Sequence, residues 1–415
     1  MAANAFGVPC LVSHDLLSRP KSRRHWLMKS ASTAAVTVVT AGVAWPAVGQ
    51  WTVTNLHPPT AARSSANATT GSHQVGFADI GGTARAGLWN RTAASWLDLH
   101  PEGATASEAY DIAGTQQVGK AIIDGVTRAS LWTGTSSSWV DLNPSGAQES
   151  IALATNGLQQ VGYALLNGRF RPSIWHGTAE SWMDLGSDGV HAIVYGLSDI
   201  EQVGESLIGF SFRATLWRGT AESRIDLHPA ESSSSQATAA AGTQQVGFAV
   251  FSEVQHAALW RGTSSSFVDL NPPGSVRSHA LATSGAQQVG YAFVDGTFRA
   301  CLWSGTAESW VDLAALLPGT WRSSFANAIW TDGGTTRIAG SGFNTATQRT
   351  EAILWTFSTT NCSADFNNNG SVDLFDYLDF VQAFADEAPS ADFNHNGTID
   401  LFDYLDFVQV FDVGC

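Results

Sequence analysis

Short apolar segments of strand length recur throughout residues 50–357, and Gly, Asn, Ser or Pro separates each segment from the next. Four segments form one unit: an Ala-rich stretch, a stretch that contains Gln-Val-Gly, a stretch that ends in Leu-Trp, and a stretch that ends in Asp-Leu. The Gln of the second stretch recurs after 43, 43, 42, 43 and 43 residues, at Gln74, Gln117, Gln160, Gln202, Gln245 and Gln288. Four short strands in a period of about 40 residues are typical of a β-propeller blade.

Seven units can be counted if the two ends of this region are combined. Arg337–Gly340 is a degenerate seventh copy of the second stretch, and Ala352–Phe357 follows it, but no fourth stretch comes after them. Trp51–Pro58 supplies that stretch at the front, with Asn55 at the position of the usual Asp. We therefore expect an all-β, seven-bladed propeller over residues 50–357, closed by its N-terminal strand so that no sheet edge is exposed. Because one blade cannot bury both of its faces, we expect the Leu-Trp tryptophans between blades.

The apolar pattern changes beyond residue 361, where two copies of Leu-Phe-Asp-Tyr-Leu-Asp-Phe-Val-Gln occur. Apolar residues recur there at spacings of four and three, as Leu374, Leu378 and Val381 and as Leu401, Leu405 and Val408. This spacing predicts two short helices that pack together through one apolar stripe each.

Composition agrees with a strand-rich chain, because 415 residues include 40 Gly and 16 Trp and only 14% are charged. The net charge of −15 is uneven. Residues 361–415 contain eleven Asp or Glu and no Lys or Arg, and residues 1–49 carry +4, so residues 50–360 are left with −15 + 11 − 4 = −8. Neither the middle region nor the tail carries a net positive charge, so there is no basic footprint to support a nucleic-acid-binding protein.

The positive charge at the N-terminus belongs to a signal-peptide pattern over residues 1–49. Ser22–Lys29 is basic, and the weakly apolar run Ala31–Ala47 follows it. Arg23-Arg24 resembles the twin-arginine export motif, and the general secretory route is the alternative. The run is shorter than the roughly 20 apolar residues of a membrane span, so no transmembrane segment is expected after cleavage. We expect an exported bacterial protein that is extracellular, surface-bound or periplasmic.

Export also bears on the four cysteines, because disulfides persist outside the cytoplasm. Cys10 lies in the leader and Cys301 inside a repeat, whereas Cys362 and Cys415 bracket the acidic tail. We expect a disulfide between Cys362 and Cys415.

The repeat of residues 50–357 resembles the extracellular HAF repeat, named for His-Ala-Phe before Leu-Trp. His256–Trp260 is the nearest match, and most other copies have Arg at the His position. This resemblance implies no defined activity.

An acidic residue recurs in every blade, in the stretch that ends in Asp-Leu. A residue that every blade repeats serves the blade, so we expect these carboxylates to pair with the Arg of the Leu-Trp strand or to cap the next turn: Asp98, Asp141, Asp184, Asp226, Asp269 and Asp312. Catalysis would instead use departures from the repeat, namely Tyr110, Asp111, Lys120, His191, Tyr195, Glu205, Glu253, Trp330 and Asp332. No pair of these has a diagnostic spacing. A binding or scaffold propeller is favoured over an enzyme, and carbohydrate binding at its mouth is the weaker option because one Trp per blade indicates core packing.

The acidic tail contains two copies of an EF-hand-like, twelve-residue calcium loop. Calcium prefers six or seven oxygen ligands, which such a loop supplies from positions 1, 3, 5, 7, 9 and 12, with Gly at position 6. These positions are Asp365, Asn367, Asn369, Ser371, Asp373 and Asp376 in the first copy, and Asp392, Asn394, Asn396, Thr398, Asp400 and Asp403 in the second. We therefore expect two Ca²⁺ ions, and the repeated apolar pattern argues against a merely solvated acidic tail.

A calcium loop followed by a helix, present twice and closed by Asp, resembles the dockerin domain over residues 361–415. The resemblance implies calcium-dependent docking onto a cohesin-like partner through positions 10 and 11, which are Leu374-Phe375 and Leu401-Phe402 here. Because the two copies are nearly identical, either could face the partner. The alternative is a dockerin-tethered, polysaccharide-degrading enzyme with its active site on the propeller.

Overall fold

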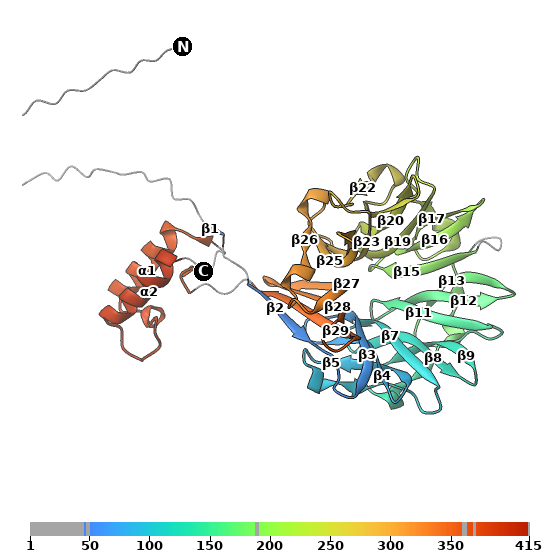
Figure 1. Cartoon of the computed structure of the whole chain (residues 1–415), viewed down its shortest axis with the longest axis horizontal. Coiled ribbons are helices and arrows are strands. Elements are labelled where there is room, and N and C mark those ends of the chain that lie inside the picture. Colours follow the sequence, from blue (N-terminus) through green and yellow to red (C-terminus); the bar gives the residue numbers. More distant parts are fainter. Residues whose placement is uncertain (1–44, 47–49, 187–190, 359–362, 368–370, 414–415) are drawn as a thin grey trace, which may run out of the picture. The chain divides into compact units, whose positions relative to one another are not determined.

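The computed structural model describes residues 45–46, 50–186, 191–358, 363–367 and 371–413. Residues 50–358 form seven four-stranded antiparallel sheets arranged as blades around a common axis (Figure 1). The first strand of each blade contacts the first strands of both neighbouring blades, so these strands surround the axis. This arrangement confirms the predicted seven-bladed propeller.

The strands follow the sequence repeat. Blade one is β3 (Ala61–Thr69), β4 (Gln74–Ile80), β5 (Thr83–Trp89) and β6 (Leu97–Asp98). Blade two is β7 (Ala106–Ala113), β8 (Gln116–Ile123), β9 (Val126–Trp132) and β10 (Val140–Asp141). Blade three is β11 (Glu149–Thr155), β12 (Gln160–Leu166), β13 (Arg169–Trp175) and β14 (Met183–Asp184). Blade four is β15 (Ala192–Leu197), β16 (Gln202–Ile208), β17 (Ser211–Trp217) and β18 (Ile225–Asp226). Blade five is β19 (Ser234–Ala241), β20 (Gln244–Phe251), β21 (Val254–Trp260) and β22 (Val268–Asp269). Blade six is β23 (Arg277–Thr283), β24 (Gln288–Val294), β25 (Thr297–Trp303) and β26 (Val311–Asp312). A short 3-10 turn precedes the last strand of these six blades, at Ala93–Ser95, Ser136–Ser138, Ala179–Ser181, Ala221–Ser223, Ser264–Ser266 and Ala307–Ser309.

Blade seven joins the two ends of the propeller. Its strands are β27 (Trp321–Asp332), β28 (Thr335–Asn344), β29 (Arg349–Ser358) and, from the N-terminal end, β2 (Gln50–Asn55). The β2 strand pairs with β29 in antiparallel register, with Trp51 opposite Phe357 and the two ring centroids 5.2 Å apart. The expected closure of the ring by the N-terminal strand is therefore confirmed.

The Leu-Trp tryptophans fill the interfaces between blades. All seven are at most 1% exposed: Trp89, Trp132, Trp175, Trp217, Trp260, Trp303 and Trp355. Each packs against apolar residues of the preceding blade, as Trp217 of blade four does against Val161 and Ile174 of blade three. The apolar core is thus distributed over seven equivalent interfaces, and no blade is buried without its neighbours.

The Gly of the Gln-Val-Gly stretch is required by a bulge in the first strand of each blade. In blade one the register of β3 shifts between Ala66 and Ala68. A Cβ on Gly76 would lie 1.9 Å from the carbonyl oxygen of Ser65, far inside van der Waals contact. Only glycine allows the second strand to approach the bulged first strand so closely.

Two helices follow the propeller in the chain, α1 (Leu374–Ala385) and α2 (Leu401–Val413), with a 3-10 turn at Pro389–Ala391 between them. Their contact is aromatic: Phe380 and Phe407 are fully buried and stack with ring centroids 3.9 Å apart and planes 6° from parallel. Tyr377 and Tyr404 flank this pair and are joined by a 2.8 Å hydrogen bond. Two short strands, β1 (Trp45–Pro46) and β30 (Ser371–Val372), pair antiparallel.

The predicted apolar stripe of these helices is wrong for its four leucines, whereas Val408 does pack against the aromatic core. Four of its leucines are half exposed or more, at 53% for Leu374, 50% for Leu378, 63% for Leu401 and 51% for Leu405. The aromatic residues, which recur at the same helical spacing, occupy the interface instead, because burying a large ring removes more apolar surface from water than burying a leucine. No described helix is long and apolar enough to cross a membrane.

Candidate functional site

The second predicted calcium loop is described throughout, and its oxygens gather around a few backbone N–H groups. The N–H of Asn396 donates to Asp392 Oδ1 at 3.0 Å and to Asn394 Oδ1 at 3.1 Å. Gly397, at φ +87°, donates its N–H to Asp392 Oδ2 at 2.9 Å. The amide nitrogen of Asn394 turns away to Asp406 Oδ2, which leaves its oxygen facing the loop.

Asp403, at position 12, closes this loop from the start of α2. Its carboxylate is fully buried and accepts hydrogen bonds from the N–H groups of Asn394, at 3.1 Å, and of Asp400, at 2.9 Å. These backbone hydrogen bonds, from Asp400 first, hold the pKa of Asp403 below its ordinary value. The loop thus keeps this carboxylate ionised and fixed in position.

The described part of the first loop repeats this geometry. Asp376 is fully buried and accepts from the N–H groups of Asn367, at 3.1 Å, and of Asp373, at 2.9 Å. Asn367 also donates its amide to Asp379, as Asn394 does to Asp406. Asp365 is buried at position 1 and Ser371 lies in β30, whereas Asn369 lies outside the described residues.

The oxygen atoms of the two predicted loops suit a hard divalent cation as ligands, since they are all carboxylate or amide oxygens and belong to one short loop in each copy. In the described residues, no group of three or more His, Cys, Asp or Glu side chains is already arranged around a common metal position. The carboxylates of the second loop accept from backbone N–H groups instead, and an ion would compete with those N–H groups for the same oxygens.

The residues predicted to meet a partner are exposed in both copies. Phe375 is 65% and Phe402 66% exposed, next to the exposed Leu374 and Leu401. The predicted disulfide partners, Cys362 and Cys415, lie outside the described residues, as does nearly all of the predicted leader. Cys301 is buried as a free thiol in blade six.

On the propeller, the repeated Asp residues have the expected structural roles. In the six regular blades one carboxylate oxygen pairs with the basic residue of the Leu-Trp strand, as Asp141 does with Arg128 at 2.6 Å. The other oxygen accepts the backbone N–H two residues later, as Asp141 does from Asn143 at 2.8 Å. The remaining pairs are Arg85–Asp98, Arg171–Asp184, Arg213–Asp226, His256–Asp269 and Arg299–Asp312.

In blade seven the acidic residue of the pair is Glu351 on β29, and Asn55 on β2 takes the place of the repeated Asp. Asn55 Nδ2 donates to Glu351 Oε2 at 2.7 Å, and Asn55 Oδ1 accepts the N–H of His57 at 2.8 Å. Burial opposes ionisation of Glu351, but hydrogen bonds from Thr347, Asn344 and Asn55 lower its pKa. The closing pair therefore keeps the geometry of the others with its charge on the opposite strand.

We expect Asn55→Asp to destabilise the protein at neutral pH by about 1–3 kcal/mol, because it places a second carboxylate against a nearly buried one. Repulsion raises the pKa of this pair in the folded state above its unfolded value of about 4. The loss of stability should therefore vanish in acid and grow as the pH rises through 4 to 7. Urea unfolding at pH 4 and 7 measures it. The control is Asn55→Ala, which removes the amide without adding charge. If both variants lose stability with the same dependence on pH, repulsion between the two carboxylates is not the cause.

A second repeated contact, which no spacing in the sequence indicates, joins neighbouring blades at five of the seven junctions. His57 Nδ1 lies 2.8 Å from Ser64 Oγ, and His57 Nε2 lies 3.0 Å from the carbonyl of Ala61. Since a carbonyl can only accept, Nε2 carries the proton and Ser64 donates its hydroxyl to Nδ1. Ser64 Oγ in turn accepts the N–H of Ala352, so this buried serine is not a nucleophile despite its histidine partner.

The same Ser contact recurs with His or Asn two residues after the repeated Asp. The other pairs, at 2.6–2.8 Å, are His100–Ser107, Asn143–Ser150, His228–Ser235 and Asn271–Ser278. We call this contact the junction lock.

A cavity of about 410 Å³ lies where the first strands meet around the axis, and it is lined by one residue from each blade: Asn67, Tyr110, Leu153, Tyr195, Thr238, Leu281 and Asn327, with Ser65, Phe325 and Ser341 beside them. None of these side chains carries a formal charge. Tyr110 donates its hydroxyl to Glu108 at 2.8 Å, and Tyr195 donates to Glu205 at 3.0 Å. Burial and these carboxylates raise the pKa of both tyrosines, so their hydroxyl groups stay protonated and the lining of the cavity stays uncharged.

Some predicted departures from the repeat therefore lie together, but without a catalytic arrangement. Lys120 approaches Glu108 at 3.5 Å, beside Tyr110. Burial raises the pKa of Asp111 to about 6, although its carboxylate accepts two backbone N–H groups. The others are dispersed: His191 lies against Phe170 and Phe212, Trp330 lies under Arg337, Glu253 is in a hairpin turn, and Asp332 ends β27.

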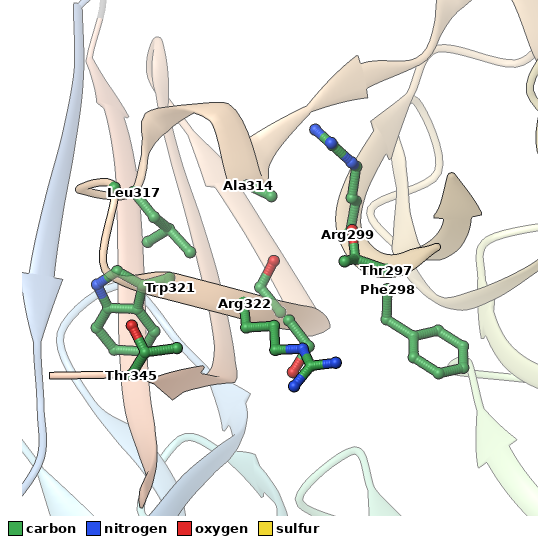
Figure 2. Close-up of a pocket in the computed structure, with 11 residues that line it drawn as sticks. Thr297, Phe298, Arg299, Ala314, Leu317, Trp321, Arg322 and Thr345 are labelled. Atoms are coloured by element: carbon green, nitrogen blue, oxygen red, sulfur yellow. The ribbon is translucent and has the colours of Figure 1, made fainter. Parts of the chain in front are cut away.

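A further cavity, of about 330 Å³, lies at the junction of blades six and seven, and we call it the junction pocket (Figure 2). It is lined by Thr297, Phe298, Arg299, Ala314, Leu317, Gly319, Trp321, Arg322, Ser323, Ser324 and Thr345. Figure 2 shows Leu317 and Trp321 on one side and Phe298 and Arg299 on the other, with Arg322 between them. No motif or spacing in the sequence indicates this pocket.

No protein-family model matches this sequence, and no curated protein is similar to it. Solved structures do share the propeller. The β-propeller domain of the Trilobed protease from Pyrococcus furiosus, described as having an open velcro topology, is 11% identical with a TM-score of 0.50 over 72% of this chain and 96% of that chain. An acylaminoacyl peptidase in complex with Z-Gly-Gly-Phe-chloromethyl ketone is 10% identical with a TM-score of 0.50 over 74% of this chain and 54% of that one. At these identities the likeness shows the fold alone, and β2 here closes the ring.

Proposed function

We propose that this protein is an exported, calcium-dependent docking protein. Its C-terminal segment binds two calcium ions and attaches the chain to a cohesin-like partner, and its propeller is a binding module. The observation that carries the proposal is the matching geometry of Asp376 and Asp403, which are both buried at position 12 and both accept the N–H groups of positions 3 and 9. Two loops built alike, in a segment without Lys or Arg, favour binding of cations.

The exposed apolar residues at the start of both helices support docking through either copy. Phe375 and Phe402 occupy equivalent positions, 27 residues apart, and are exposed to the same extent. Aromatic side chains exposed on a small helical unit are typical anchors of an interface with another protein. Calcium would act by fixing each loop and thereby the first turn of the helix that presents these anchors.

Replacing both anchors tests the proposal. With Phe375→Ser and Phe402→Ser together, we expect calcium-dependent capture of a cohesin-like protein to weaken more than tenfold, because an aromatic anchor typically contributes more than 1.4 kcal/mol. Each single variant should retain capture through the other copy. Binding is measured by surface capture in calcium and in chelator, with calcium uptake by calorimetry as the control. Capture that is equally strong in chelator would contradict the proposed role of calcium.

A further inference from the structure

The junction between blades six and seven lacks the junction lock. Ser324 of β27 accepts the N–H of Ala300 at 3.0 Å, as the other lock serines accept from their preceding blades. However, Ala314 stands where the other locks have His or Asn, so the hydroxyl proton of Ser324 has no acceptor among the described residues. Ser324 is fully buried and lines the junction pocket. A buried hydroxyl without an acceptor indicates a place where a ligand atom would be favoured.

An insertion at the same junction opens the pocket. Ser324 follows the repeated Asp312 by 12 residues, whereas Ser107 follows Asp98 by 9. The three extra residues lie in the segment that forms the 3-10 turn Leu313–Leu316 and brings Trp321 to the start of β27. Trp321 lines the junction pocket and also a neighbouring cavity of about 500 Å³. The junction of blades six and seven has thus gained space and an aromatic wall.

The junction pocket is basic within an acidic protein. Arg299 is already paired with Asp312 at 2.6 Å and also lies 4.0 Å from Asp295, so the positive charge of the pocket comes from Arg322, which is exposed and has no ion pair in the described part of the chain. None of the described lining residues is Asp or Glu. Outside the lining, Arg277 lies over the ring of Phe298 at 4.9 Å and adds a third guanidinium nearby. A planar guanidinium binds carboxylates through two parallel hydrogen bonds, and aromatic walls suit the apolar face of a sugar ring.

We propose that the junction pocket binds a uronate residue of an acidic polysaccharide, an inference that rests on the proposed role of the propeller as a binding module. Arg322 pairs with the uronate carboxylate. Ser324 donates its free hydroxyl proton to an oxygen of the same sugar. Trp321 packs against the sugar ring, and its neighbouring cavity receives the next residue of the chain.

Two variants of the full-length protein test this assignment. Arg322→Gln removes the carboxylate partner and is expected to weaken binding of a trigalacturonate by about ten- to a hundredfold. Ala314→Asn supplies the residue that forms the lock at Asn143 and Asn271, with a backbone N–H held by Asp312 in the same way, and should occupy the pocket without unfolding the protein. Arg261→Gln, at another exposed arginine, is the control and should bind like the natural protein.

Binding is measured by calorimetry in chelator, so that calcium cannot bridge the uronate to the acidic tail. Trigalacturonate is compared with neutral trigalactose and with a sulfated trisaccharide. Preference for trigalacturonate, lost in Arg322→Gln and Ala314→Asn, supports the proposal. Binding that both variants leave unchanged, or a preference for the neutral or sulfated sugar, overturns it. Absence of binding to all three sugars overturns it as well, and calcium uptake by the tail under separate, chelator-free conditions then shows whether the docking function stands by itself.

Discussion

Replacing Asp376 and Asp403 together by alanine is expected to abolish calcium uptake by the C-terminal segment while the propeller stays folded. Each carboxylate closes its loop and is held by two backbone N–H groups, so its loss removes a proposed calcium ligand and also frees both N–H groups. Eleven acidic groups without a base repel one another, and two Ca²⁺ ions offset four of these charges. Ion binding and folding of the helical pair should therefore be linked.

Calorimetry of the full-length protein measures this uptake directly, and circular dichroism with chelator and then calcium follows the helices. The matched control is Glu387→Gln with Asp412→Asn, which removes the same charge outside both loops. This control should retain the binding heat, whereas the double alanine variant should show none at millimolar calcium. An unchanged binding heat in the alanine variant would contradict the assignment of both loops.

The second large effect concerns the core of the propeller. Trp217→Ala is expected to lower the free energy of unfolding by about 3–5 kcal/mol, because it deletes a ring that is 1% exposed and leaves a cavity against blade three. The loss affects two blades at once, since the ring belongs to one and its partners belong to the other.

Urea unfolding in chelator measures this change, so that the calcium binding proposed for the tail does not contribute. The matched control is Phe210→Ala, because Phe210 lies in the same blade and is fully exposed at the tip of the β16–β17 hairpin. Its effect should stay within about 0.5 kcal/mol. Equal stability of the two variants would show that the interfaces between blades contribute little.

The fold could be predicted because the same order of apolar strands and turn residues recurs seven times at a nearly constant spacing. The copy number, the closing role of Trp51–Pro58 and the structural role of the repeated Asp all followed from comparing copies with one another. The tail was harder, since Leu378 and Phe380 are both apolar at helical spacing and periodicity does not decide which faces the partner helix. Their sizes decide it, because the larger ring gains more by burial.

The junction pocket could not be predicted, because it arises from a side chain that is missing. Ala314 does not stand out in the sequence. Its importance becomes clear only when the serines equivalent to Ser324 at other junctions are seen to bond a His or Asn at the position of Ala314. That pairing joins residues of neighbouring blades across a turn, and its spacing resembles no catalytic or metal-binding motif. The junction lock had therefore to be seen in three dimensions before its absence could be recognised.

The pairing of Gln50 with Ser358 places the two ends of the propeller next to each other on adjacent strands. The break in the covalent chain then lies between β29 and β2, where each of the other blades has a connecting turn between its third and fourth strands. Joining these two ends by a short linker and opening any of those turns should give circular permutants with the same ring. Each permutant would present its termini at a different blade, which would let an attached module be placed at any of seven positions around one axis.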